Sequence, residues 1–309
     1  MYKNIFIILI LIIIFIIINN YLLNKVSKNI DLNIGNYLVL YFYLMGKSFL
    51  KGDDFHYNLK SVDFIKDLPS YIPLDHNIRN ELLKNNFTIE ELVKEEKEII
   101  MVAMWTIINK RREKFWLIMK PLINKILNDT FEKNNLERNV DCPVIHFRCS
   151  DTPFIRNGYY FFQKYKFFKD SLDSIKRETG INYKKVKLLS CNFHKSTDKN
   201  SKTCNIYANS LKDFLENNGY EVIIQCNSNI DDFATIFYAP AIISTCSSFS
   251  FIAGFFSNGL FISEGHYDCN INKKKCVDCG DWLKHGYSIS HNDVKDYYNT
   301  NEVIRLLKD

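Results

Sequence analysis

The stretch Pro143-Val-Ile-His-Phe-Arg-Cys-Ser-Asp-Thr-Pro-Phe154 decides the fold of the second half of this chain. Its first residues form a short apolar run, which predicts a buried strand. A polar cluster that includes Arg148 follows, and then Pro153, which is typical of a helix start. In α/β proteins, a basic side chain after a buried strand, followed by small polar residues and a helix, is a common form of phosphate site. We therefore expect a phosphate group at Arg148.

Downstream of this stretch, short apolar runs alternate with helical patterns. Strand and helix that alternate through short connections predict a parallel sheet with right-handed crossovers. The expected fold class is thus α/β, with a Rossmann-like domain over residues 142–265. The expected strands are 144–147, 186–189, 222–224, 241–244 and 260–262, and the expected helices are 159–179, 205–218, 231–238 and 247–257.

The region upstream, 34–141, begins with Ile34-Gly35-Asn36 and continues with apolar residues at helical spacing. A Gly-Asn pair at a helix start lets the backbone turn sharply and offers free N–H groups to a ligand, although most such pairs are ordinary turns. A strand is expected at 55–57 and helices at 89–97 and 97–119, with Pro121 as a boundary before a further helix to about 137. The polar segment 134–142 is the expected domain boundary.

The N-terminus is strongly apolar: residues 5–18 contain no polar side chain. Together with the residues up to 23, this run approaches the roughly 20 residues that a bilayer requires. We expect residues 1–23 to form a transmembrane signal-anchor and residues 24–33 a short stem. A cleaved signal peptide would end in small residues, which are missing here, and a buried core helix would show periodicity. Lys3 lies on one side and Lys25 and Lys28 on the other, so the charges do not predict the orientation.

Nine cysteines favour a location in the secretory lumen, of the endoplasmic reticulum or Golgi, because disulfides persist there. The sequons at Asn86 and Asn128 are compatible with a lumen.

In the C-terminal tail, 266–309, three cysteines and two histidines cluster. One Cys-x-x-Cys pair is too few ligands for a structural zinc site, so local disulfides are the preferred interpretation. The clustered residues are Cys269, Cys276, Cys279, His266 and His285.

At 309 residues the chain is long enough for two domains. Its formal charge of +5 is mild and its basic residues are scattered, which argues against nucleic acid as a partner and fits small anionic ligands or a membrane surface.

Polar residues follow several of the expected strands, at the edge where open α/β sheets bind ligands. Small hydroxyl residues at a helix start can hold phosphate oxygens or simply cap the helix. The adjacent acids Asp231 and Asp232 can be present simply because negative charge at a helix start is favourable to the helix dipole. A histidine within a strand, such as His146, is by default a hydrogen-bonded core residue. The candidates are His146, Arg148 and Asp151 after the first strand, Asp231 and Asp232 after the third, and Ser244, Thr245, Cys246, Ser247 and Ser248 after the fourth.

Three of these motifs, taken together, resemble a known family. His146-Phe-Arg-Cys-Ser-Asp151 has the form H-x-R-x-x-D, which is similar to the motif of the α-1,2-, α-1,6- and protein O-fucosyltransferases of the GT-B superfamily. Asp232 and the later Ser247-Ser-Phe-Ser250 resemble their donor-binding motif. Gly35-Asn36 is similar to the pair that opens their acceptor domain. The motifs occur in the family's order and cover most of residues 34–265.

The resemblance implies a GT-B-like fold of two Rossmann-like domains, with 34–141 on the acceptor side and 142–265 holding the nucleotide sugar. It implies a glycosyltransferase that moves fucose from GDP-fucose to a glycan or glycoprotein acceptor with inversion, without a metal or other cofactor. Arg148 would contact the diphosphate and support its departure, and Asp151 is the nearest candidate for a second catalytic residue. His146, Asp232, Ser247, Ser248, Phe249, Gly35 and Asn36 would help to bind the donor.

One departure from the family pattern leaves alternatives open. Many members have a second arginine directly after the first, and here that position is Cys149. The lost charge would weaken diphosphate binding unless another basic residue, such as Arg156, replaces it. The alternatives are a GT-B glycosyltransferase that uses another nucleotide sugar, and a non-catalytic membrane protein that keeps the fold.

Overall fold

The computed structural model of the chain describes residues 34–57, 67–93, 110–149, 152–155, 162–191, 197–245, 247–263, 288–289 and 292–309. The expected membrane anchor at 1–23, the stem at 24–33 and the cysteines of the tail lie outside these residues. Within the described ranges, no helix is both long and apolar enough to cross a bilayer. Membrane anchoring therefore stays a prediction from the sequence.

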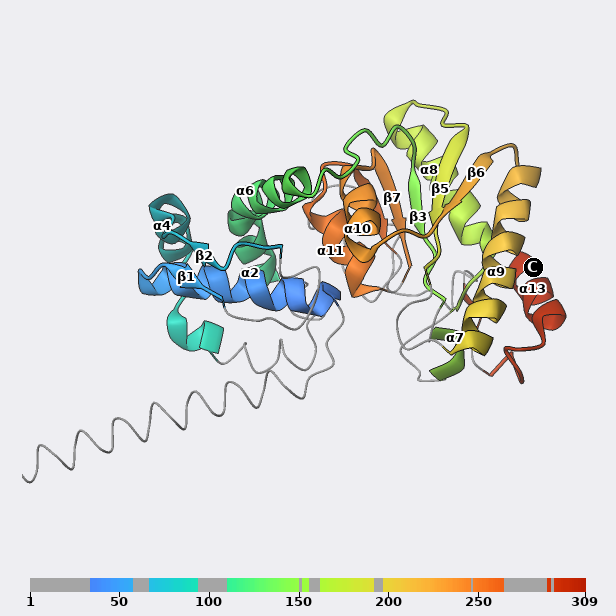
Figure 1. Ribbon diagram of the computed structural model, residues 1–309, viewed down its shortest axis with the longest axis horizontal. Helices are drawn as coiled ribbons and strands as arrows, with labels where there is room; N and C mark the ends of the chain where they lie inside the picture. The colour runs from blue at the N-terminus through green and yellow to red at the C-terminus, as the bar shows by residue number, and fades with distance from the viewer. Residues whose placement is uncertain are drawn as a thin grey trace, which may run out of the picture.

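Five parallel strands form the central sheet, in the order β6-β5-β3-β7-β8 (Figure 1). The strand that comes first in sequence, β3, lies in the middle, and the winding reverses beside it between β3 and β7. This order is Rossmann-like, and the prediction of an α/β protein with a parallel sheet is confirmed. The strands are β3 (Val144–His146), β5 (Lys185–Leu189), β6 (Glu221–Gln225), β7 (Ala241–Ser244) and β8 (Leu260–Ser263).

Helices cover both faces of the sheet, and consecutive residues of β3 show how the faces divide. Val144 packs with one apolar cluster and Ile145 with the other, as the alternation of side chains along a strand requires. The first face is covered by α10 (Asn229–Tyr238) and α11 (Ser248–Phe256). The second is covered by α8 (Tyr165–Thr179), α9 (Asp198–Asn217) and α13 (Thr300–Lys308). Along the chain, the short helix α7 (Thr152–Ile155) comes between β3 and α8.

The expected helix at 159–179 is wrong in its first part. Phe162–Gln163 form strand β4, which pairs antiparallel with β9 (Ser288–Ile289) from the tail. The helix begins only at Tyr165, and it ends at Gly180, whose φ of +72° is the left-handed conformation that glycine adopts most easily. The aromatic side chain of Phe162 is fully buried with those of Phe147 and Tyr207, so packing rather than helical spacing explains the apolar residues here.

The described residues before Pro143 do not form a second parallel sheet, in contrast to the expected second Rossmann-like domain. They form three long or medium helices, a single turn of helix near residue 90 and one antiparallel pair of very short strands. The apolar residues of this region recur mainly at helical spacing, which buries one face of each helix and leaves little strand-forming sequence. The elements are α2 (Ile34–Lys51), β1 (Phe55–His56), β2 (Tyr71–Ile72), α4 (His76–Lys84) and α6 (Lys110–Lys133).

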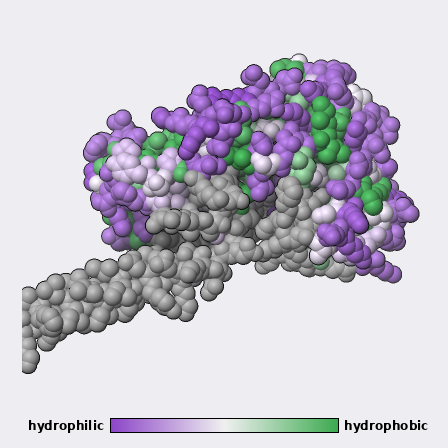
Figure 2. All heavy atoms as spheres, in the orientation of Figure 1, coloured by the Kyte–Doolittle hydropathy of each residue, from purple (hydrophilic) through white to green (hydrophobic). Residues whose placement is uncertain are grey.

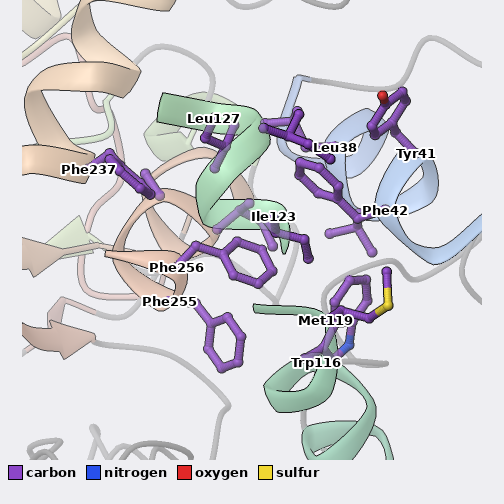
Figure 3. Close-up of a cluster of buried hydrophobic side chains, with 14 of the residues drawn as sticks. Leu38, Tyr41, Phe42, Trp116, Met119, Ile123, Leu127, Phe237, Phe255 and Phe256 are labelled. Carbon is purple, nitrogen blue, oxygen red and sulfur yellow. The ribbon is translucent and has the colours of Figure 1, made fainter. Parts of the chain in front are cut away.

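These N-terminal helices share one continuous core with the first face of the sheet. Figure 1 shows α2, α4 and α6 on the far side of α10 and α11 from the strands, and α2 packs directly on α11. Figure 3 shows side chains from α2 and α6 around Phe256 of α11, where the rings of Phe42 and Trp116 contact it. Outside this core, hydrophilic residues cover most of the described surface in Figure 2, with only small separate hydrophobic areas.

Pro121 lies inside α6 rather than at a boundary, so that prediction is wrong. A proline removes one helical hydrogen bond, here the one to the carbonyl of Leu117. Both residues lie on the outer side of the helix, where Leu117 is 40% exposed, so water can satisfy the freed carbonyl. The turn before the proline is held to α11, because the Lys120 Nζ donates to the Phe255 and Ser257 carbonyls at 2.9 and 3.2 Å. A cation is favourable at that helix C-terminus.

Candidate functional site

The candidate site begins where β3 and β7 end side by side. The backbone N–H of Arg148 donates to the Thr245 Oγ1 at 3.1 Å, and this hydroxyl donates to the His146 carbonyl at 3.0 Å. Thr245 is 1% exposed, so both hydrogen bonds are shielded from water. One threonine side chain therefore fixes the course of the backbone that carries both His146 and Arg148.

His146 and Arg148 are two residues apart in extended backbone and project from the same side of the strand end. The imidazole of His146 lies 5.8 Å from the ring of Phe249, centroid to centroid. Burial, together with the nearby positive charge of Arg148, lowers the pKa of His146 to about 3. The ring is therefore neutral at physiological pH. Its Nδ1 atom is buried and has no hydrogen-bond partner among the described residues, which differs from the hydrogen-bonded core histidine that is the default interpretation.

Helix α11 starts next to this histidine. Ser247 is its N-cap residue, but the Ser247 side chain makes no capping hydrogen bond. Both Ser247 and Ser248 are buried. The interpretation of Ser247 as a simple side-chain cap is therefore wrong, and the first-turn amide groups of α11 do not depend on its hydroxyl. The turn is instead tied to β7, because the hydroxyls of Ser244 and Ser250 are hydrogen-bonded at 2.7 Å.

The N-terminus of α2 reaches the same point. Gly35 lies so close to α11 that an added Cβ would be 2.5 Å from the Ser248 carbonyl carbon and 2.7 Å from the Phe249 nitrogen. Contacts below 3.0 Å with backbone atoms do not occur in real side chains, so only glycine fits here. Asn36 follows in the first turn and is half-buried. Two helix N-termini, each with the positive end of its dipole, thus converge beside His146 and Arg148.

Asp232 lies in the first turn of α10, beyond Phe233, whose ring contacts Phe249 at 5.4 Å between centroids. The Asp232 Oδ1 accepts hydrogen bonds from the Gln225 Nε2 at 3.0 Å and the Asn227 N–H at 3.3 Å. Burial raises the pKa of this carboxyl group. Asp231 differs: it is partly exposed and bonds with Ser228, the N-cap of the helix. Of the two acids, only Asp231 fits the interpretation of a charge that stabilises the N-terminus of the helix.

Cys149, at the position of the family's second arginine, is fully buried and forms a disulfide with Cys204 of α9. Its side chain packs in the cluster on the second face of the sheet, away from His146. A side chain at position 149 therefore does not face the point where the N-termini of α2 and α11 meet. The disulfide instead attaches the segment after β3 to α9, directly beside Arg148. A second disulfide, Cys191–Cys226, joins the ends of β5 and β6.

The expected site residues are thus partly brought together. His146, Phe249, Ser248 and Gly35 are in direct or near contact, and Arg148, Ser247 and Asn36 are their chain neighbours. Asp232 lies one side chain further away, on α10. Asp151, Arg156 and Cys246 fall outside the described residues.

Gln225 is a position of the candidate site that the strand-end pattern does not single out. Its place at the end of a strand is the sole sequence signal for Gln225. Thr245 is a predicted candidate, but its run of small residues does not predict that its hydroxyl bonds the backbone of both His146 and Arg148. The described residues contain no group of three or more potential metal ligands. Metal independence stays a prediction, because the tail with Cys269, Cys276 and Cys279 is not among them.

Comparison with known proteins gives no match: no protein-family model, no curated protein and no solved structure matches this chain. The class that the fold defines is a mixed α/β protein with a Rossmann-like parallel sheet. Its candidate site lies at the carboxyl ends of β3 and β7, the switch point at which such sheets bind ligands.

Proposed function

We propose that this chain is a glycosyltransferase that transfers fucose from GDP-fucose to a glycan or glycoprotein acceptor, with inversion and without a metal ion. The observation that carries the proposal is the convergence of the α2 and α11 N-termini next to His146 and Arg148. This convergence lies at the switch point of a Rossmann-like sheet. The H-x-R-x-x-D and Ser-Ser-Phe-Ser motifs, which resemble those of fucosyltransferases, supply the residues at that point.

The chemistry of a nucleoside diphosphate leaving group suits this arrangement. Negative charge grows on the diphosphate as the bond to the sugar breaks, and a metal-free enzyme must offset it with protein groups. The guanidinium of Arg148 can donate two parallel hydrogen bonds to phosphate oxygens. The first-turn amide groups of α11 and α2 add donors and dipoles of the same sign. In this proposal Arg148 assists departure, and Ser247 and Ser248 bind the diphosphate.

The neutral imidazole of His146 has a defined part in the proposal. Because its Nδ1 has no protein partner among the described residues, it is assigned to a hydrogen bond with the donor. Asp232 is assigned to the nucleoside, as the buried carboxylate in the first turn of α10, the helix that follows β6. Asp151 is the candidate for activating the acceptor hydroxyl. A membrane anchor at 1–23 and a luminal site in the endoplasmic reticulum or Golgi belong to the same proposal.

The donor is tested by ligand-dependent thermal stabilisation of the full-length protein in detergent. A ligand that binds only the folded state at 100 times its Kd adds about 2.7 kcal/mol of stability. GDP is expected to raise the melting temperature, whereas UDP and CMP at equal concentration leave it unchanged. A preference for UDP would overturn the choice of donor and favour a transferase for another nucleotide sugar.

The reaction is tested with Arg148→Ala and Arg148→Lys. Transfer of fucose to an acceptor panel, followed by product mass, is expected to fall at least about a hundredfold in Arg148→Ala, the size of effect seen when a leaving-group stabiliser is removed. Arg148→Lys keeps the positive charge but cannot donate two parallel hydrogen bonds to a phosphate, so it is expected to retain part of the activity. Arg177→Ala on α8 is the control, because Arg177 is exposed and, within the described part of the chain, donates a hydrogen bond to its helix neighbour Ser174. Unchanged turnover in Arg148→Ala would sink the assignment, and GDP binding without transfer to any acceptor would favour a non-catalytic protein.

A further inference from the structure

The two disulfides among the described residues differ in how accessible they are to a reagent. Cys149 and Cys204 are both 0% exposed and lie inside the apolar cluster on the second face of the sheet. The Cys191–Cys226 bridge joins the ends of β5 and β6, the outermost strand pair on one side of the sheet, where Cys226 is exposed and Cys191 is half-buried. A thiolate must reach a disulfide sulfur to attack it. Of these two described bridges, Cys191–Cys226 alone meets this condition.

The half-buried sulfur of this bridge touches a carboxyl group. The Cys191 Sγ lies 3.0 Å from the Asp232 Oδ2, while the other oxygen of Asp232 is held by Gln225 and Asn227. Asp232 is only 4% exposed, so these hydrogen bonds keep its carboxyl group in place beside the sulfur. The environment of the two sulfurs is therefore asymmetric: solvent at Cys226, and a fixed acidic group at Cys191.

We propose that Cys191–Cys226 is a thiol-exchange site, at which a small thiol forms a mixed disulfide with Cys226. The thiolate of the incoming molecule attacks the Cys226 Sγ, and a new S–S bond forms there. The bond between the two cysteine sulfurs breaks, and its electron pair remains on the Cys191 Sγ, which takes a proton from water. A second thiol then releases Cys226 as a free thiol, so that two thiols are oxidised to one disulfide and the protein bridge is reduced.

Asp232 controls this exchange from the side of the leaving sulfur. A thiolate that forms 3.0 Å from an ionised carboxylate is repelled, which raises its pKa, and a thiol of higher pKa leaves more slowly. The carboxylate thus slows the opening of the bridge. Once Cys191 is protonated, its S–H can donate to the same Oδ2 atom, so the opened form is held in place. This site does not depend on the proposed transferase activity.

The test uses full-length oxidised protein in detergent at pH 8 with 2-mercaptoethanol, without any nucleotide. Samples are quenched at intervals with N-ethylmaleimide and analysed by peptide mass spectrometry. The mixed disulfide is expected on Cys226 and the maleimide adduct on Cys191, with Cys149–Cys204 opening at least about tenfold more slowly because access controls the rate. Equal rates for the two bridges, or a mixed disulfide on Cys191 instead of Cys226, would overturn the proposal.

A matched pair of variants tests the part of Asp232. Asp232→Asn removes the charge beside the sulfur and is expected to speed the opening of the bridge several-fold. Asp231→Asn removes a neighbouring charge that bonds with Ser228, and its rate is expected to stay within about twofold of the parent. Equal rates in the two variants would remove Asp232 from the proposal. The measurement on the parent protein decides the exchange site itself, even if Asp232→Asn does not fold.

Discussion

The backbone N–H of Arg148 donates a hydrogen bond of 3.1 Å to the hydroxyl of Thr245, which in turn donates to the His146 carbonyl. This pairing links the two strands just beyond their last sheet pair, His146 with Ser244: Thr245 is one residue past Ser244, and Arg148 is two residues past His146. The position of the guanidinium therefore depends on a side chain from another strand. Thr245 is a positioning residue, since its own hydroxyl is engaged with the backbone.

Thr245→Val is expected to lower the free energy of unfolding by about 1–3 kcal/mol, because it removes a buried hydroxyl that hydrogen-bonds both the Arg148 N–H and the His146 carbonyl. Urea unfolding measures this change. In the proposed function, the same variant weakens GDP binding, measured by thermal shift. Thr245→Ser keeps the hydroxyl and is expected to restore most of the GDP affinity while losing only the packing of one methyl group. Equal behaviour of the two variants would show that the hydroxyl does not position Arg148.

Gly35→Ala is expected to disturb the approach of α2 to α11, because the new Cβ would lie within 2.7 Å of three backbone atoms of Ser248 and Phe249. Neither helix end can move without changing the site. We expect a loss of GDP affinity that exceeds the loss of stability, measured by titration and by urea unfolding.

Gly46→Ala, in the same helix α2, is the control. Its Cβ would meet the Phe115 ring and the Met119 sulfur of α6 in the apolar core. It is expected to lower stability and to leave GDP affinity unchanged at temperatures where the protein is folded. A fall in affinity in both variants to the same degree would mean that the contact at Gly35 has no special relation to the site.

The parallel sheet was accessible to sequence reasoning because its strands are short apolar runs between clear breaks. Strand β7 occupies the predicted residues, Ala241 to Ser244. Helix α9 begins at Asp198, well before the expected start, because its first turns carry mostly polar residues and lack an apolar period. Its N-cap, Thr197, which accepts from the Asn200 N–H, was the available signal.

The sequence predicts only part of the candidate site, for a physical reason. The carboxyl ends of parallel strands meet at one edge, so residues such as His146 and Ser247 can be grouped from the chain alone. The packing of Gly35 on Ser248 is a contact between distant helices, and no local pattern predicts which glycine makes it. Cys149 shows the same limit: its neighbour Arg148 follows the motif, but its disulfide with Cys204 depends on the position of α9, and spacing does not specify the pairing.

His146 is expected to make the stability of the protein fall with acid. Its pKa is about 3 in the folded protein, against 6.5 when it is unperturbed. Between these values the unfolded chain binds one more proton, so stability is complete above pH 6.5 and is lost as the pH falls towards 3. The slope from this group approaches about 1.4 kcal/mol per pH unit.

Urea unfolding of the parent protein and of His146→Gln from pH 4 to 7 measures this contribution. The curve of the variant is expected to be flatter by that slope, because glutamine does not titrate. His76→Gln in α4 is the control at an exposed histidine. Parallel curves for the parent and His146→Gln would show that the imidazole is already protonated when the protein is folded, or that it is open to water.

The two sequons are expected to differ in glycosylation, because the fold treats them differently. Asn86 follows α4 with a φ of +58° and is exposed, as is Thr88. Asn128 lies within α6, where its Nδ2 donates to the Asn124 carbonyl at 2.8 Å and its Oδ1 accepts from the Tyr238 hydroxyl at 2.5 Å, so a glycan would separate α6 from α10. When the full-length protein is made in cells with a secretory pathway, Asn86→Gln is expected to abolish the glycosidase-sensitive shift in mobility, and Asn128→Gln to leave it intact. A shift that disappears only in Asn128→Gln would contradict the packing of α6 on α10, and a protein without any shift would contradict the luminal orientation.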